Sequence, residues 1–390
     1  MDNALPPAPW TKRPDLVRLI AALGGGNARY VGGAVRDTLL GLEVKDIDLA
    51  TPLVPGKVIA RLKAAEIRTV PTGIEHGTIT ALLDLGPVEI TTLRHDVSTD
   101  GRRATVAFAE DWREDAARRD FTINALYADP QTGELTDYFG GLDDLAARRV
   151  RFIGDARQRI REDHLRILRY FRFQARFGSE PADTDSENAC AELAAMLKGL
   201  SRERIGMEMK NLLALPDPSR VAARMAELGV LAVILPEASV APLAALVAEE
   251  RRQEIAPDAL RRLAALLPAD VAVVEQVAAR FRLSGTQKKR LACAAGRNEM
   301  PLNPHALAYR LGMDQALDRL LLVGGDTAPL KGWTIPSLPL KGGDIVARGI
   351  KAGPEVARIL RAVEDRWVTE GFPGETRIGE MLAEMMGKMA

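Results

Sequence analysis

The sequence has little cysteine and histidine, which limits the metal and redox chemistry open to it. Its 390 residues include two cysteines and four histidines. Cys190 and Cys293 lie far apart and neither has metal-ligand spacing around it, so a cluster of cysteine or histidine ligands is not expected. Such sparse cysteine usage suits a reducing cytosol, where we expect both thiols to be small buried side chains.

Long apolar runs and a net charge are also missing. No apolar run approaches the roughly 20 residues that a membrane-spanning helix needs, and residues 1–10 lack the basic and apolar regions of a signal peptide. We therefore expect a cytoplasmic protein without a membrane partner, and no protein partner is evident. Because 53 basic residues balance 53 acidic ones, any contact with RNA must come from a local patch. Residues 151–176, with eight arginines against three acidic residues, form one such patch.

The distribution of local patterns predicts an α+β fold class. Runs rich in β-branched residues, bounded by Gly, Pro or Asp, predict strands at 28–32, 47–50, 68–71, 77–84 and 88–93. Helical patterns lie between them at 35–40 and 55–65. Beyond about residue 155, apolar residues recur at helical spacing, as in 163–177, 189–197, 203–213, 219–228 and 258–267. The Pro- and Gly-rich segment 324–344 predicts a linker or long loop, with helices resuming at Asp344.

The first chemically suggestive string is Val31–Asp37, which reads Val-Gly-Gly-Ala-Val-Arg-Asp. A strand ends, two glycines make a tight turn, and a helix begins. Glycines let the backbone approach a triphosphate closely, and the free N–H groups of a helix N-terminus favour anions. Gly33 and Arg36 are therefore candidate phosphate contacts, although paired glycines after a strand are more often only a turn.

Ten residues later, Asp46 and Asp48 flank Ile47. On a strand, positions i and i+2 project to the same face, so the two side chains are expected to present paired carboxylates. Two like charges so close raise each other's proton affinity unless a cation neutralises them. Mg²⁺ binds through one or two carboxylates together with substrate phosphates. The pair is thus a candidate magnesium site, although an isolated Asp-x-Asp is usually an acidic turn.

Two further strings carry arginine beside a carboxylate. In Arg118–Ala125, Arg119 is a candidate for phosphate or ribose binding, because guanidinium presents a rigid fork of donors. In Arg161–Phe173, a predicted helix places Asp163 and Arg166 three residues apart and makes them neighbours. The bland interpretation is an ion pair. The functional one is a protein edge that reads a base, since a carboxylate accepts from the exocyclic amine of C or A, which U and G lack.

Taken together, in this order and spacing, the four strings resemble class II tRNA nucleotidyltransferases, the bacterial CCA-adding enzymes, and their relatives the bacterial poly(A) polymerases. The resemblance is strong over roughly 28–178 and includes the intervening strings at 73–80, 89–94 and 137–141. In the helical remainder only Leu340–Asp344 and Gly353–Pro354 look familiar.

The resemblance implies a polymerase-β-type head with a mixed sheet, followed by an all-α neck, body and tail. The expected boundaries are 1–155, 156–215, 216–323 and 324–390. It implies that Asp46 and Asp48 carry Mg²⁺ and act as the catalytic pair. Glu89 is a less strongly supported candidate for a third acidic group near the metal. It also implies that CTP and ATP are substrates and that a tRNA 3′ end is the acceptor. The implied nucleotide-binding residues are Gly33, Arg36, Arg119, Asp163, Arg166, Arg169 and Arg172.

Several alternatives stay open at this point. A poly(A) polymerase would share all four strings, but the basic, His-containing signature usual after the paired aspartates is absent from Ala50–Gly56, and the chain from Lys341 onward carries eight basic and eight acidic residues. Partial CC- or A-adding activity and an inactive RNA-binding protein also remain. A phosphohydrolase is disfavoured because its His-Asp dipeptide, His95-Asp96, falls in segment 94–104 of the head. The resemblance implies that this segment is a mobile loop that helps the enzyme switch from CTP to ATP.

Overall fold

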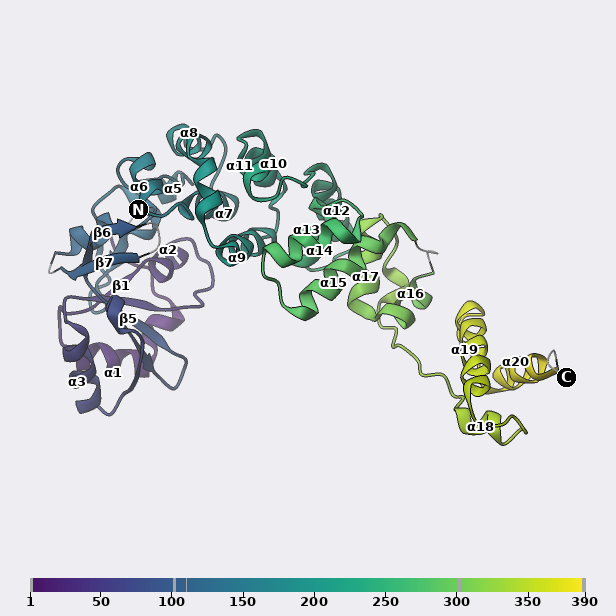
Figure 1. Ribbon diagram of the computed structural model, residues 1–390. Helices are drawn as coiled ribbons and strands as arrows, with labels where there is room; N and C mark the ends of the chain where they lie inside the picture. The colour runs from purple at the N-terminus through teal and green to yellow at the C-terminus, as the bar shows by residue number, and fades with distance from the viewer. Residues whose placement is uncertain (1–2, 101–102, 110, 300–302, 388–390) are drawn as a thin grey trace. The chain divides into compact units, whose positions relative to one another are not determined.

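The computed structural model describes residues 3–100, 103–109, 111–299 and 303–387. Within these residues the strands are confined to the N-terminal part, drawn purple and blue, and everything after Asp137 is helical or irregular (Figure 1). The chain divides into two compact units. The first comprises Met1–Leu212 and Arg220–Pro236, and the second comprises Leu213–Ser219 and Glu237–Ala390. The expected α+β class is confirmed.

A seven-stranded mixed sheet forms the frame of the first unit. Its strands run in the order β3-β4-β5-β2-β1-β8-β9. They are β1 (Arg29–Val31), β2 (Asp48–Thr51), β3 (Arg68–Gly73), β4 (Thr78–Leu82), β5 (Val88–Thr92), β8 (Leu126–Ala128) and β9 (Leu135–Asp137). β2 and β5 are parallel, and every other neighbouring pair is antiparallel. The central strands β2 and β1 are therefore paired on both edges, which holds the residues at their ends in place.

The structure adds two strand pairs to the five predicted strands. β8 and β9 have only three residues each, too short to show a period-two pattern. The second pair, β6 (Arg94–Asp100) and β7 (Arg103–Phe108), forms a separate two-stranded antiparallel hairpin. The prediction of a loop over 94–104 is thus wrong for its described part. The first residues of that segment pair with residues beyond its end, as Arg94 does with Phe108. Residues 101 and 102 lie outside the described residues.

Eleven α-helices surround or follow this sheet in the first unit as described. They are α1 (Pro14–Leu23), α2 (Gly33–Leu39), α3 (Pro55–Ala64), α4 (Trp112–Ala117), α5 (Gly141–Ala146), α6 (Ala156–Glu162), α7 (Arg166–Phe177), α8 (Thr184–Glu192), α9 (Arg202–Leu213), α10 (Ser219–Glu227) and α11 (Val230–Ile234). α1 shows why they form: Leu16, Leu19, Ile20 and Leu23 recur at helical spacing and are all buried. α7 buries one apolar face in the same way and leaves arginines on the other.

The predicted helix 163–177 is wrong at its start. Asp163 ends α6 in an extended conformation, with φ −148° and ψ 105°, and α7 begins only at Arg166. The break lies inside a run of helix-forming residues, so propensity gives no sign of it.

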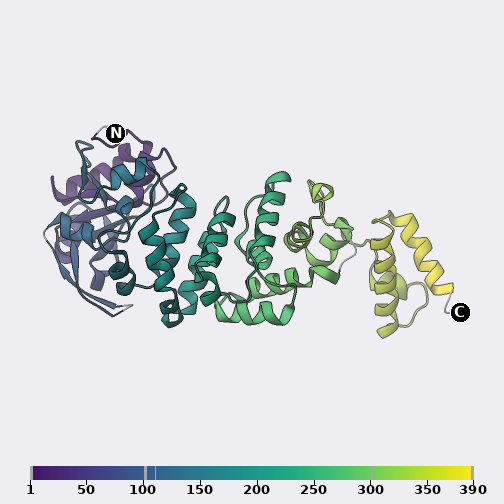
Figure 2. The ribbon, with the colours of Figure 1, turned by 90° about the horizontal axis from the view of Figure 1, so that it is seen from above.

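The second unit is built from α-helices in the residues that the structure covers. They are α12 (Ala241–Arg252), α13 (Ala259–Leu266), α14 (Val271–Arg280), α15 (Gly285–Ala295), α16 (Pro304–Leu311), α17 (Met313–Leu322), α18 (Gly342–Val346), α19 (Pro354–Thr369) and α20 (Glu375–Gly387). α19 and α20, drawn yellow, lie side by side in both views (Figures 1 and 2) and share a core with Trp367 and Met381. No helix among the described residues is long and apolar enough to cross a membrane.

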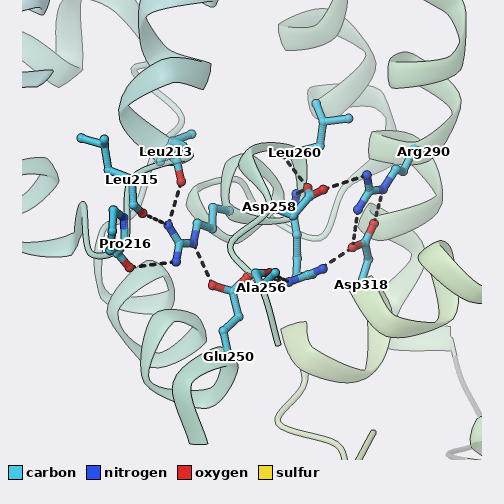
Figure 3. A network of polar contacts seen from close by, with 11 residues as sticks. Leu213, Leu215, Pro216, Glu250, Ala256, Asp258, Leu260, Arg290 and Asp318 are labelled. Carbon is cyan, nitrogen blue, oxygen red and sulfur yellow. Dashed lines mark hydrogen bonds and ion pairs between the residues drawn. The ribbon is translucent and has the colours of Figure 1, made fainter. Parts of the chain in front are cut away.

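A buried network of ion pairs crosses the interior of the second unit (Figure 3). Arg262, 1% exposed, donates to Glu250 and to the backbone carbonyls of Leu213, Leu215 and Pro216. Arg261 joins Glu250 to Asp318, which also binds Arg290. Every charge in the network has a partner, as burial in a low-dielectric interior requires.

The segment predicted as a linker is largely irregular. Between α17 and α18 the regular structure is one short 3₁₀ turn at Ala328–Leu330, and helices resume at Gly342, two residues before the predicted start. The two cysteines differ from each other: Cys190 is buried as expected, whereas Cys293 is partly exposed.

Candidate active site

A polar cleft of about 770 Å³ opens in the first unit, and all nine residues that the sequence singled out line it. They are Gly33, Arg36, Asp46, Asp48, Arg119, Asp163, Arg166, Arg169 and Arg172. The remaining lining residues are Gly32, Arg94, Arg118, Asp120, Asn124, Leu165, Phe173 and Arg204. Arginines outnumber aspartates among these described residues by eight to four, so the cleft as a whole suits an anion.

The glycine turn forms one wall of the cleft. Gly32 precedes α2 with φ 67° and ψ −122°, a backbone conformation that side chains other than hydrogen disfavour. A Cβ there would lie 3.4 Å from Nη1 of Arg119, so glycine also leaves room for that guanidinium. Gly33 then begins α2, which turns the helix N-terminus towards the cleft as the sequence predicted.

Arg36 is held rigidly in the same wall. Its side chain is 7% exposed, pairs with Asp37 at 2.6 Å, and donates to the amide oxygen of Asn124. Its guanidinium lies 4.1 Å from the ring centroid of Phe177. Burial lowers the pKa of Arg36, while the charge of Asp37 counteracts that effect. The guanidinium is thus fixed before any ligand arrives, which reduces the entropy lost on binding.

The acidic pair lies at the start of β2. Asp48 opens the strand, whereas Asp46 precedes it and is exposed. The premise that both residues lie on one strand is therefore wrong, although both side chains line the cleft. Burial raises the pKa of Asp48 to about 6, helped by the negative charges of Glu89 and Asp46 and opposed by Arg119.

Glu89 is the neighbour of Asp48 in the sheet. The two residues are directly paired across the parallel β2 and β5 strands, so their side chains leave the same face. Glu89 is exposed and does not line the cleft. It contributes negative potential to the site; its membership of a metal site stays a prediction.

Arg119 and its neighbours form another part of the lining, beside the glycine turn. Arg119 donates through Nη2 to Asp115 at 3.1 Å and through Nε to the hydroxyl of Tyr127 at 3.3 Å. Asp120 accepts from Nε of Arg169 at 2.8 Å and from Asn124. Burial raises the pKa of Asp120, but the charge of Arg169 and these hydrogen bonds outweigh it, so the net pKa is about 2.

The expected pair of Asp163 and Arg166 is built differently from the prediction. Because the helix breaks between them, they are not paired with each other. Asp163 accepts from Nη2 of Arg204 at 2.8 Å. Arg166 pairs with Glu162 at 2.6 Å and donates to the carbonyl of Arg118 at 3.1 Å. Each side chain therefore has its own anchor, and both still line one cleft.

The arginine-rich segment is not a continuous basic surface. Arg169 and Arg172 line the cleft, where Arg172 pairs at 2.7 Å with Glu208, itself 4% exposed. In contrast, Arg157 pairs with Asp185 and Glu192 and is not among the residues that line the cleft. The patch thus separates into cleft residues and structural ion pairs.

Five polar residues of the cleft were not singled out by the sequence: Arg94, Arg118, Asp120, Asn124 and Arg204. Asp120 and Asn124 belong to a string that was recognised, and their roles could have been sought there. Arg204 lies on α9, 41 residues from Asp163, and no local pattern marks it.

The comparisons with known proteins agree with this geometry. Residues 28–151 match the model of the poly A polymerase head domain. Residues 183–241 match a model described as the probable RNA and SrmB-binding site of polymerase A. Two regions of the chain thus match domains of the poly A polymerase family. The nucleotidyltransferase family of CCA-adding enzymes generally depends on a metal ion.

Two relatives illustrate how far the sequence similarity extends. The human mitochondrial CCA tRNA nucleotidyltransferase 1 is 51% identical over 188 residues, which cover 47% of this chain and 43% of the human protein. The CCA-adding enzyme of Streptococcus gordonii is 43% identical over 205 residues, which cover 52% of this chain and 49% of that enzyme. The chain thus matches about half the length of these curated relatives.

Solved structures of the family extend the likeness to nearly the whole chain. The CCA-adding enzyme of Bacillus stearothermophilus in complex with CTP superposes with a TM-score of 0.73 at 26% identity, covering 97% of this chain and 99% of that one. The Thermotoga maritima CCA-adding enzyme complexed with tRNA gives 0.72 at 22% identity, covering 97% and 96%. At that identity the second match shows the shared fold alone.

The acidic pair has the donor chemistry that a hard divalent cation needs. Asp46 and Asp48 offer carboxylate oxygens to the cleft. Burial raises the pKa of Asp48, and the negative charges of Glu89 and Asp46 raise it further; a cation would offset those charges. Among the residues that the structure describes, no group of three His, Cys, Asp or Glu could hold a metal on its own. A two-carboxylate site is completed by substrate phosphates in many magnesium enzymes.

Proposed function

We propose that this nucleotidyltransferase adds C, C and A to the 3′ end of tRNA, using CTP and ATP and releasing pyrophosphate. The observation that carries the proposal is the convergence of three groups in one cleft: an acidic pair, a set of anchored arginines, and a carboxylate and guanidinium at the α6–α7 break. Each group serves a different part of a nucleotidyl transfer. Together the three groups supply the contacts that a nucleotidyl transfer needs.

The first step is binding of the triphosphate. We assign the phosphates and sugar to Gly33, Arg36 and Arg119, with Arg169 and Arg172 assisting. Arginine forks give paired, charge-assisted hydrogen bonds to phosphate oxygens. Because these side chains are already held by aspartates and glutamates, little rotamer freedom is lost when the nucleotide binds.

The second step is selection of the base. Asp163 accepts from the exocyclic amine of cytosine or adenine, and Arg166 donates to the adjacent ring acceptor. Uracil and guanine present a carbonyl where that amine would be, which leaves a carboxylate unpaired and costs about 1–3 kcal/mol. Selection without a nucleic-acid template then rests on two side chains held by Arg204 and Glu162.

The third step is nucleotidyl transfer. The 3′ oxygen of the RNA forms a bond to the α-phosphorus, the bond from that phosphorus to the bridging oxygen breaks, and pyrophosphate leaves with the electron pair. Asp46 and Asp48 would hold Mg²⁺, which when bound lowers the pKa of the attacking hydroxyl and offsets charge on the leaving group. The arginines bind the released pyrophosphate in the position of the β- and γ-phosphates.

The remaining parts of the chain would grip the acceptor. We propose a head at 1–155, a neck at 156–215, a body at 216–323 and a tail at 324–390, with the tail contacting tRNA. A cytosolic location is also proposed, on the basis of cysteine usage. Expression of a fluorescently tagged chain in its host would contradict this location if the signal collected in an organelle.

The experiment that tests the function supplies nucleotides one at a time. The protein and Mg²⁺ are incubated with tRNAs that end before, within and after CCA, and products are resolved at single-nucleotide resolution. Three additions in the order C, C, A, followed by a stop, are expected. A long A-tract would instead indicate a poly(A) polymerase, and a stop after CC or an addition of A alone would indicate a partial enzyme. Asp46→Ala should abolish incorporation without loss of RNA binding.

A further inference from the structure

Behind the cleft lies one buried carboxylate that binds two cleft arginines at once. Asp115, on α4, is 1% exposed and is not itself among the lining residues. Its Oδ1 accepts from Nε of Arg118 at 2.9 Å, and its Oδ2 accepts from Nη2 of Arg119 at 3.1 Å. Both of these arginines line the cleft. The orientation of the two guanidiniums thus depends on a group that no ligand reaches.

The same carboxylate is tied to the sheet. The hydroxyl of Tyr127 donates to Oδ2 of Asp115 at 2.7 Å and accepts from Nε of Arg119 at 3.3 Å. Tyr127 is fully buried on β8, paired directly with Val31 of β1, the residue before the glycine turn. A second tie comes from the backbone N–H of Arg94, at the start of the β6–β7 hairpin, 3.4 Å from Oδ1. Asp115 therefore joins α4, the sheet and the start of the hairpin.

The charge balance explains why this residue matters. Arg118 and Arg119 are adjacent in sequence, and without a shared counter-ion their charges would repel one another. Burial raises the pKa of Asp115, but the charges of Arg119 and Arg118 and the hydrogen bond from Tyr127 outweigh it, and the net pKa is about 2. The carboxylate is therefore ionised at neutral pH. Asparagine in its place would carry no charge and only one acceptor oxygen, so the two guanidiniums would lose their common counter-ion and one of them its acceptor.

We propose that Asp115 is a positioning residue that sets Arg118 and Arg119 for the triphosphate. The inference rests on the proposed function only in that the cleft binds a nucleoside triphosphate. It adds to that function a residue that touches neither the nucleotide nor the metal. Its action is on the affinity of nucleotide binding, because the two arginines meet the phosphates before any bond changes.

The chain supplies a matched control for the loss of a buried carboxylate. Asp144, on α5, is also fully buried and binds two arginines, with Nε of Arg149 and Nε of Arg151 each at 2.6 Å. Neither arginine lines the cleft. Asp144→Asn therefore removes a buried carboxylate with two arginine partners from the same unit, although these arginines are more exposed than Arg118 and Arg119.

The test compares Asp115→Asn with Asp144→Asn and the unchanged protein. The dissociation constants of CTP and ATP are measured by titration calorimetry with Mg²⁺, beside KM and kcat for addition to tRNA. Asp115→Asn should weaken both nucleotides by roughly tenfold, the loss expected for hydrogen bonds to charged groups, and should raise KM by a similar factor with a far smaller change in kcat. Asp144→Asn should leave both constants unchanged even where it lowers the melting temperature.

Two outcomes would overturn the inference: unchanged nucleotide affinity in Asp115→Asn, or an equal loss in both variants, which would indicate only a structural role. Should Asp115→Asn fail to fold, Tyr127→Phe tests the same anchor by removing one hydroxyl. A smaller loss of affinity supports the inference and an unchanged affinity overturns it. If the unchanged protein binds neither nucleotide, both proposals fall. If it binds them but does not add C, C and A, only the proposed function falls.

Discussion

At the scale of single residues, the aspartate at the start of β2 shows a conflict between stability and function. Asp48 lies largely buried beside Glu89 and Asp46, and its pKa is raised to about 6 from the ordinary value of 3.8. A carboxyl whose folded pKa exceeds its unfolded pKa destabilises the folded state wherever it is ionised. That penalty is present above pH 6 and diminishes as the pH falls towards 4, because the folded protein then takes up the proton.

The first prediction follows from the upward shift of the pKa of Asp48. In the presence of a chelator at pH 7, Asp48→Asn should stabilise the first unit by about 1–3 kcal/mol, while abolishing nucleotide addition. The gain should shrink as the pH is lowered below 6, where Asp48 is itself neutral. Thermal unfolding followed by circular dichroism at pH 5 and pH 7 measures it. Asp84→Asn, at an exposed aspartate, is the control, and a gain that does not depend on pH would contradict the assignment.

Gly32 and Gly141 are both required to be glycine, but for different structural reasons. Gly32 adopts a positive φ and leaves room for Arg119, so it is required by the turn itself. Gly141 has an ordinary φ, but a Cβ there would press against the backbone carbonyl of Thr122 and lie 3.0 Å from Leu126. The sequence shows both only as glycine in a recognised string. Only the fold shows why each is glycine.

At the scale of elements, the close approach of α5 to the 3₁₀ turn at Thr122–Asn124 is a packing requirement that can be tested. Gly141→Ala should destabilise the first unit by about 1–3 kcal/mol, the cost of overpacking against atoms that cannot move aside. Gly285→Ala, also at the first residue of a helix but with no atom within 4 Å of the added Cβ, should be neutral or slightly stabilising. Melting temperatures measured by circular dichroism compare the two, and equal shifts would refute the packing argument.

Elements with a strong local signal were predicted well. α3 was expected at 55–65 and spans Pro55–Ala64, because a proline marks its first turn and its apolar residues recur at helical spacing. α13 was expected at 258–267; it spans Ala259–Leu266, with Asp258 accepting two backbone N–H groups as its cap. Residues within these helices or next to them determine where both ends lie. The sequence near each helix is therefore enough to predict its bounds.

Elements that depend on distant partners were not predicted. The β6–β7 hairpin and the short strands β8 and β9 are extended because they pair across the chain. At the break between α6 and α7, Asp163 accepts from Arg204 of α9, 41 residues away. Arg204 is far from the break along the chain, and the pairing of Arg94 with Phe108 leaves no local pattern, so propensity alone predicted a continuous helix in one case and a loop in the other.

At the scale of the whole molecule, the segment at which the chain first enters the second unit is bound by one buried side chain, that of Arg262. Segment 213–219 belongs to the second unit, and its first residue, Leu213, is the last residue of α9. The guanidinium of Arg262 binds three carbonyls of this segment and pairs with Glu250 at 2.8 Å (Figure 3). The network therefore fixes the crossing segment to the interior of the second unit.

The third prediction concerns this network. Arg262→Met should destabilise the second unit by about 3–5 kcal/mol, because Glu250 loses one buried partner and three carbonyls lose their donor. Arg251→Met is the matched control: its partner Asp217 lies 3.3 Å away in an exposed pair, worth about 0–1 kcal/mol. Hydrogen exchange measured by mass spectrometry should show faster exchange in α12 and α13 for Arg262→Met alone. Unchanged exchange in those helices would contradict the prediction.

The sequence by itself singled out nine residues that line the cleft and the order in which they occur, since the four strings are contiguous and each contains its own turn, acid or arginine. It also determined the α+β class, because periodicity and composition change clearly near residue 155. Only the tertiary structure decided how the functional side chains are held: Asp163 by Arg204, Arg172 by Glu208, and Arg119 by Asp115. The physical reason is that function requires oriented charges, and a buried charge is oriented by whichever opposite charge the fold brings beside it, at any separation along the chain.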